Sequence, residues 1–163
     1  MGGGKGASTN NVHFLKTNSG KKGQGMPVVR NSKFYFREGF CWIDVNSTYL
    51  KARIKDRGVF DVLSMSLFSM TEIPDWYYVS LINSELISLY VDNFINNTSH
   101  FQINDARQLP VIIPSQQVLD RLSTIVKRAE EIKKHEYFGR TSETELDQLQ
   151  VELDTTIAQF YSI

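Results

Sequence analysis

The residues best suited to chemistry in this sequence are cations that recur at every second position. Lys51, Arg53, Lys55 and Arg57 form this run. A Lys or Arg side chain that neutralises a phosphate releases counterions, and arginine can also read guanine through two hydrogen bonds in the major groove. The run therefore predicts a phosphate-binding surface. The alternative is that these cations form a solvated strand face with no binding role. Further cations lie upstream, around an aromatic stretch and in a glycine-rich loop: Arg30, Lys33, Arg37, Lys21 and Lys22.

Charge is distributed unevenly along the 163 residues, although the net charge is zero. Residues 1–60 carry 11 Lys and Arg against 3 Asp and Glu, whereas residues 61–163 carry 7 against 15. A basic segment is a common footprint for a polyanion, most often nucleic acid. The alternative is a basic surface that is solvated and has no partner.

The other reactive residues form no complete active site. The histidines are scattered and lack metal-binding spacing: His13, His100 and His135. The single cysteine, Cys41, lies between two aromatic residues, so we expect a small buried hydrophobe and no disulfide framework. A metal-dependent nuclease built on Asp75 and Glu85 is disfavoured, because no lysine stands two residues after the glutamate. No glycine-rich loop follows a strand, so no nucleotide cofactor is expected.

Short aromatic and β-branched segments between residues 28 and 70 predict a small, curled antiparallel sheet. The expected strands cover residues 34–36, 40–43, 49–55, 59–63 and 66–70. In the third of these, a period of two places Lys51, Arg53 and Lys55 on one face and the intervening apolar residues on the other. Three aromatic residues are expected in the core or on a sheet face rather than stacked on bases: Tyr35, Trp42 and Tyr49.

The period becomes helical after Pro74. Apolar residues from Tyr78 to Phe94 predict one helix of about five turns. A loop with a strand-like piece at residues 109–114 follows. Two further helices are predicted from Ser115 and from Ser142, since apolar residues recur there at steps of three and four. A short connection between these helices predicts an antiparallel hairpin.

Several short motifs in this half of the chain occur in a distinctive order. Asn83-Ser84 lies in the predicted helix, and Pro114-Ser115 opens the next one. Between them runs a Thr-x-x-Phe-x-x-x-Asp-x-Arg-x-Leu-Pro stretch, formed by Thr98, Phe101, Asp105, Arg107, Leu109 and Pro110. These motifs closely resemble the C-terminal specificity region of adenine-N6 DNA methyltransferases of the TaqI type. That group includes single-chain (type IIG) restriction–modification enzymes and the PglX-like methyltransferases of phage defence.

The resemblance extends over about residues 28–163. Upstream, residues 34–42 resemble the aromatic strand and Gly-x-x-Trp of the family, and Ala52-Arg53 and residues 58–61 also fit. Downstream, residues 145–149 and the tail resemble the closing helix that type I specificity subunits also carry. The Thr98–Pro110 motif is then expected to be structural, with Asp105 and Arg107 fixing a loop through charge-assisted hydrogen bonds.

The resemblance implies a target-recognition domain that holds duplex DNA, while a separate methyltransferase domain flips and methylates the adenine. The catalytic Asn/Asp-Pro-Pro-Tyr/Phe motif and the glycine motif for S-adenosylmethionine are both absent. We therefore expect no catalytic residue, metal or cofactor in this chain. S-adenosylmethionine would belong to the missing domain, which becomes the expected partner together with DNA.

These observations predict an α+β fold. Residues 1–27 form a flexible or tag-like start, residues 28–114 a recognition lobe of sheet and supporting helix, and residues 115–163 the helical hairpin. DNA contacts are expected from the cations named above: Lys51, Arg53, Lys55, Arg57, Arg30, Lys33, Arg37, Lys21 and Lys22.

The alternative function is a protein-interaction or spacer module of a restriction–modification complex that does not bind DNA. Its hairpin stripes would pair with a second copy of the chain, and this homodimer would persist at high salt, where DNA binding fades. No apolar run is long enough to cross a membrane, and no apolar core follows the N-terminal residues. The sequence therefore predicts a cytoplasmic protein without a secretory signal.

Overall fold

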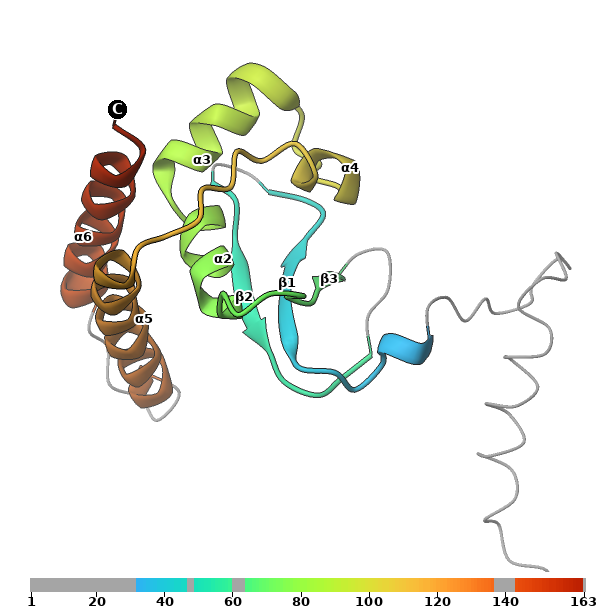
Figure 1. Ribbon diagram of the computed structural model, residues 1–163, viewed down its shortest axis with the longest axis horizontal. Helices are drawn as coiled ribbons and strands as arrows, with labels where there is room; N and C mark the ends of the chain where they lie inside the picture. Colours follow the sequence, from blue (N-terminus) through green and yellow to red (C-terminus); the bar gives the residue numbers. More distant parts are fainter. Residues whose placement is uncertain (1–31, 47–48, 60–63, 137–142, 163) are drawn as a thin grey trace, which may run out of the picture. The chain divides into compact units, whose positions relative to one another are not determined.

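The computed structural model describes residues 32–46, 49–59, 64–136 and 143–162. The chain divides into two units, Met1–Phe36 and Arg37–Ile163. The described part of the first unit is the 3-10 turn η1 (Ser32–Phe34) and the two residues after it. The second unit combines an antiparallel sheet with helices and ends in a helical hairpin, which confirms the predicted α+β class (Figure 1).

Three described strands form an antiparallel sheet with the order β2-β1-β3. The strands are β1 (Gly39–Ile43), β2 (Ala52–Lys55) and β3 (Ser64–Leu67). The strand predicted at residues 34–36 is wrong, because η1 and a turn occupy these residues and Phe36 has a φ of 61°. A positive φ is incompatible with an extended strand. The last predicted strand begins two residues earlier than expected, and residues 60–63 lie outside the described part.

The single long helix predicted after Pro74 is wrong, since it is interrupted at Asn83 and Ser84. The structure instead has α2 (Asp75–Ile82), α3 (Glu85–Tyr90) and a π-helical turn, η2 (Val91–Ile95). Ser84 caps α3, because its hydroxyl accepts a hydrogen bond from the backbone N–H of Ile87 at 3.3 Å. The Asn83 amide donates to the Ala52 carbonyl at 3.0 Å and accepts from the Ala52 N–H at 2.6 Å. The interruption therefore ties the helical layer to β2.

We expect Asn83→Ala to lower the free energy of unfolding by about 1–3 kcal/mol, because the substitution leaves two backbone groups of the edge strand without partners. Urea unfolding followed by circular dichroism measures this loss. Asn93→Ala is the matched control, since the Asn93 amide is exposed and donates to the Leu89 carbonyl, one turn earlier in the chain. Equal stability of the two variants would contradict the structural role of Asn83.

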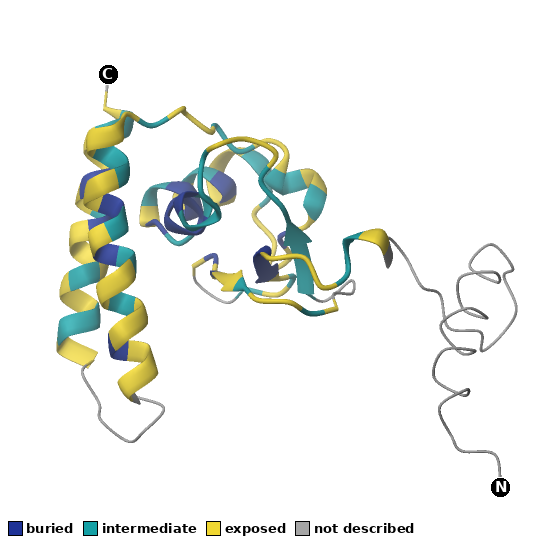
Figure 2. Cartoon of the chain, turned by 60° about the horizontal axis from the view of Figure 1, so that its bottom comes forward, coloured by how far each residue is buried: buried dark blue, intermediate teal, exposed yellow. Residues whose placement is uncertain are grey.

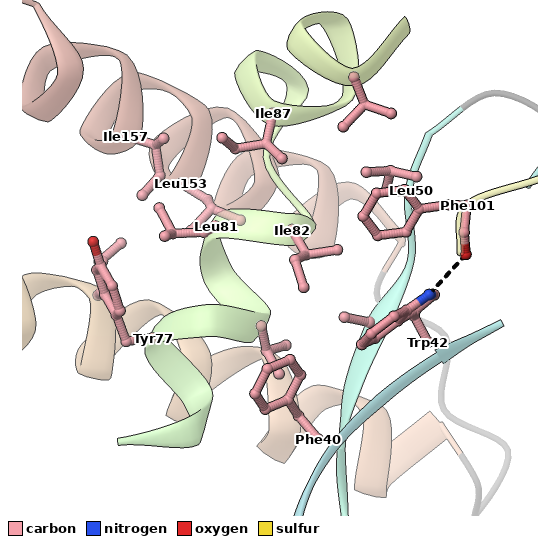
Figure 3. Packing of buried hydrophobic residues seen from close by; sticks show 14 of the residues in the cluster. Phe40, Trp42, Leu50, Tyr77, Leu81, Ile82, Ile87, Phe101, Leu153 and Ile157 are labelled. Atoms are coloured by element: carbon pink, nitrogen blue, oxygen red, sulfur yellow. Dashed lines mark hydrogen bonds between the residues drawn. The ribbon is translucent and has the colours of Figure 1, made fainter. Parts of the chain in front are cut away.

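The hydrophobic core extends from the sheet past α2 to α3 and the hairpin, and α2 contacts β1, β2 and α5 (Figure 3). Trp42 and Phe101 are each 1% exposed and their rings lie 5.7 Å apart. The Trp42 indole donates a hydrogen bond to the Phe101 carbonyl at 2.9 Å. Phe40 stacks on Tyr78 with a ring separation of 5.5 Å. The inner face of β1 thus anchors both α2 and the segment around residue 101.

The predicted hairpin is confirmed as α5 (Gln116–Glu136) and α6 (Glu143–Tyr161). Helix α5 also contacts α2, and α6 contacts α3. The buried apolar residues of the two helices are Leu122, Ile125, Ile132, Leu153 and Ile157. Much of the remaining hairpin surface is exposed (Figure 2). The other residues of the two apolar stripes are half-buried: Val118, Ala129, Leu146, Leu149 and Phe160.

The segment between the helical layers contains no strand at residues 109–114, contrary to the prediction. A short helix, α4 (Ile103–Ala106), precedes this segment. Two tyrosines hold its backbone: Tyr77 donates to the Ile112 carbonyl at 2.6 Å and Tyr161 to the Pro110 carbonyl at 2.7 Å. Burial raises the pKa of the Tyr77 and Tyr161 phenols above the ordinary value for tyrosine. Both hydroxyl groups are therefore protonated hydrogen-bond donors at neutral pH.

Candidate nucleic-acid interface

The predicted cationic face lies on the outer side of the sheet, away from α2. Phe40 and Trp42 point into the core, so alternation places Gly39, Cys41 and Ile43 on the opposite side. The register pairs Lys55 with Gly39 and Arg53 with Cys41. Arg53 and Lys55 therefore lie on the same side as Cys41, which is consistent with the 3.5 Å contact between Arg53 Nε and Cys41 Sγ.

Phe68 brings a third cation to this surface. The Arg37 guanidinium lies 5.1 Å from the centre of the Phe68 ring, and the Lys55 ammonium lies 5.4 Å from it. Both distances are within the range of cation–π attraction, which holds a cation near a ring. We call Arg37, Arg53 and Lys55 the basic face. Arg37 and Arg53 are exposed, whereas the ammonium nitrogen of Lys55 is buried. The two arginines are therefore the members of this face that are placed to meet an anionic surface.

Glycine at position 39 allows Phe68 to lie against the sheet. A Cβ atom at this position would clash with the Leu67 carbonyl oxygen and would lie 2.7 Å from Cδ1 of Phe68. The first neighbour is backbone, so a side chain at residue 39 must displace either β3 or the ring. The glycine therefore maintains both the strand pairing and the aromatic support of the basic face.

Gly39→Ala is expected to lower the free energy of unfolding by about 1–3 kcal/mol, as overpacking of a tight contact does. Gly58→Ala is the matched control, because a Cβ atom there meets no atom closer than 3.7 Å. Thermal unfolding of the two variants compares the effects directly. A Gly39→Ala protein as stable as the Gly58→Ala protein would contradict the close approach of Phe68.

The other expected DNA-contacting residues are placed less uniformly. Lys51 is exposed and directly precedes β2. Arg57 lies 3.5 Å from the Glu38 carboxylate, in an exposed ion pair that offsets part of its charge. Lys33 belongs to the first unit, where its ammonium lies 5.0 Å from the centre of the Phe34 ring. Three of the expected residues lie outside the described part of the chain: Arg30, Lys21 and Lys22.

The residues of the Thr98–Pro110 motif mainly hold the chain between η2 and α5. The Asp105 carboxylate accepts from the Gln102 N–H at 2.7 Å and from the Asn96 amide at 3.2 Å. Arg107 donates to the Asn104 side chain at 3.1 Å, and the Thr98 hydroxyl accepts from the His100 N–H at 3.3 Å. These contacts, the burial of Phe101 and the Tyr161 bond to Pro110 are all local or core interactions.

The three aromatic residues predicted to lie in the core or on a sheet face differ in exposure. Trp42 is buried in the core as expected, whereas Tyr49 is 47% exposed. That expectation is wrong for Tyr49, because the residue precedes β2 and lies neither in the core nor in a strand. Tyr35 is half-buried and belongs to the first unit. Sequence reasoning also missed Phe68 and Gly39, whose roles depend on strand register.

The described residues contain no group of three or more His, Cys, Asp or Glu side chains placed to hold a metal ion. Within the same residues, no helix has the length and apolar character needed to cross a membrane. The chain matches no protein-family model and no curated protein.

Proposed function

We propose that this chain is a duplex-DNA-binding target-recognition domain of an adenine-N6 methyltransferase from a restriction–modification or phage-defence system. The observation that carries this proposal is the basic face, where Arg37, Arg53 and Lys55 lie on one side of a small sheet. The order of the motifs from Asn83 to Ser115 supports the choice of family.

The spacing of the cations suits a phosphate backbone. Lys51 and Arg53 are both exposed and stand two residues apart at the start of β2, a spacing that separates the Cα atoms of an extended chain by about 6.6–7 Å. Duplex DNA carries a phosphate on each strand for about every 3.4 Å of its axis, so neighbouring cations can engage separate phosphates. Arginine at two of the three positions also allows paired hydrogen bonds to guanine. The surface therefore combines affinity for the backbone with the means to read a base.

The proposed chain selects DNA and performs no chemistry of its own. The methylating step belongs to a partner methyltransferase domain, which would bind S-adenosylmethionine and receive the flipped adenine. The cytoplasm is the proposed location, because the DNA that such a system modifies is found there.

Selection from a random duplex library tests the proposal of sequence recognition. The whole chain is incubated with the library at low salt, and the bound duplexes are sequenced over several rounds. We expect enrichment of one short motif, and loss of that enrichment in the Arg53→Ala variant. Retention of duplexes without any enriched sequence would contradict target recognition and leave a nonspecific DNA-binding protein.

A further inference from the structure

The outer side of the sheet, which faces away from α2, carries cations, small residues and one isoleucine. Its positions in the three described strands are Arg53 and Lys55 in β2, Gly39, Cys41 and Ile43 in β1, and Ser64 and Ser66 in β3. None of these positions holds an acidic residue, so the surface does not repel phosphates. The major groove of duplex DNA admits a two-stranded β-ribbon. The strands β1 and β2 are therefore suited to approach the edges of the bases from this side.

The Arg53 guanidinium is held at one edge and open at the other. Its Nε–H donates to the Cys41 Sγ at 3.5 Å, and its two terminal nitrogens have no hydrogen bond or ion pair within the described part of the chain. The residue is exposed, so these nitrogens are available to a ligand. A pair of parallel N–H donors matches the O6 and N7 acceptors that guanine presents in the major groove. Arg53 is therefore oriented to read a guanine.

Cations stand on both sides of Arg53 along the strand. Lys51 directly precedes β2 and is exposed. Arg37 marks the other end, because its guanidinium and the Lys55 ammonium lie against the same ring, that of Phe68. Residues 51 and 55 are about 13 Å apart in an extended chain, close to the width of the major groove, which is about 12 Å. Lys51 and Arg37 can therefore meet the phosphates that border the groove while Arg53 faces the bases.

An exposed apolar side chain lies diagonally across the strand pair from Arg53. Ile43 is two residues beyond Cys41, the residue that pairs with Arg53, and is 46% exposed. Diagonal neighbours in an antiparallel pair are about 7–8 Å apart, which corresponds to about two base-pair steps of about 3.4 Å. Apolar side chains contact the C5 methyl group of thymine in the major groove. Ile43 is therefore placed to contact a thymine within about two base pairs of the guanine.

We propose that the outer side of β1 and β2 enters the major groove, where Arg53 reads a guanine and Ile43 contacts the methyl group of a nearby thymine. This inference rests on the proposed function and goes further, because it names the residues that read bases and the bases that they read. On DNA without the recognition sequence, Arg53 contacts a phosphate instead. The slope of log K against log salt concentration is therefore expected to be less steep by about 0.9 on the recognition sequence than on a random duplex.

Chemically modified duplexes test the two base contacts one at a time. The duplex that the whole chain selects from a random library is prepared with 7-deazaguanine in place of each guanine in turn, which removes the N7 acceptor. It is also prepared with uracil in place of each thymine in turn, which removes only the methyl group. By fluorescence anisotropy at low salt, we expect one 7-deazaguanine to weaken binding by about fivefold or more and one uracil to weaken it by about threefold. Affinities that none of these replacements changes would overturn the proposal.

Two substitutions assign each effect to its side chain. Arg53→Ala is expected to bind the guanine and 7-deazaguanine duplexes equally, whereas Arg37→Ala, which also removes one cation, is expected to keep the preference for guanine. Ile43→Ala is expected to bind the thymine and uracil duplexes equally. Its control is Ile113→Ala, because Ile113 is 80% exposed and lies outside the sheet. An Arg53→Ala protein that still distinguishes guanine, or an Ile43→Ala protein that still distinguishes thymine, would overturn that contact.

The outcomes separate this inference from the proposed function. Selection of one sequence whose recognition depends on neither Arg53 nor Ile43 would overturn this inference and leave target recognition intact. Binding of duplexes without any enriched sequence would overturn both. A selected sequence that loses its guanine preference in Arg53→Ala and its thymine preference in Ile43→Ala would support both.

Discussion

The Arg53→Glu/Lys55→Glu protein is expected to bind duplex DNA at least about a hundredfold more weakly than the unmodified chain at low salt, because like charges then face the phosphates. Both side chains lie on the outer side of β2, opposite the core. The substitution replaces the exposed Arg53 cation with an anion and also reverses the charge of Lys55, one of the two cations beside Phe68. Fluorescence anisotropy with a labelled duplex measures the change in dissociation constant.

The control for this experiment changes the net charge by the same amount at another place. Lys127→Glu/Lys134→Glu reverses two exposed cations on α5, and we expect less than about a fivefold loss, since distant charges are screened. If Lys55→Glu lowers the melting temperature, Lys51→Glu/Arg53→Glu provides the same reversal at two exposed positions. Similar affinities of the outer-face and α5 variants would show that overall charge, and not the basic face, determines binding.

Trp42→Ala is expected to lower the free energy of unfolding by about 3–5 kcal/mol, the range for large aromatic residues removed from a core. The Trp42 side chain is 1% exposed and lies between Phe40 and Phe101 in ring contacts of 6.4 Å and 5.7 Å. The substitution also leaves the Phe101 carbonyl without its 2.9 Å hydrogen bond. A loss of this size is a large fraction of the stability of an ordinary domain.

Two further variants divide the Trp42 effect into its parts. Trp42→Phe keeps an aromatic ring but removes the donor, so we expect a smaller loss of about 1–3 kcal/mol. Phe94→Ala removes an aromatic ring that is 77% exposed, and we expect a change within about 0.5 kcal/mol. Urea unfolding gives all three values. A Trp42→Ala protein that is destabilised no more than Phe94→Ala would contradict the position of Trp42 in the core.

The helical hairpin was predictable because its signal is local and repeated over many turns. Apolar residues at steps of three and four run through α5 and α6, and tertiary packing agrees with that pattern. The interruption at Asn83 was not predictable from periodicity, because the apolar residues continue on both sides of it. Its cause is a long-range contact, since the Asn83 amide satisfies the backbone of Ala52, 31 residues away.

Only part of the candidate site could be predicted, for a similar reason. Alternation along residues 50–55 correctly separates Arg53 and Lys55 from the core side of the strand. Placement of Arg37 beside Lys55 requires Phe68, whose position follows from the pairing of β1 with β3. The aromatic residues at 34–36 show that a local preference can also mislead. Their side chains favour strands, but the chain forms a 3-10 turn there.

The dependence of duplex affinity on salt tests most directly whether the basic face binds DNA. The whole chain is titrated with a random-sequence duplex at several salt concentrations, and log K is plotted against log salt concentration. Three phosphate contacts, from Arg37, Lys51 and Arg53, predict a slope of about −2.7, since each contact contributes about −0.9. Absence of binding at low salt, or an affinity that does not change with salt, would contradict a DNA-binding surface on this sheet.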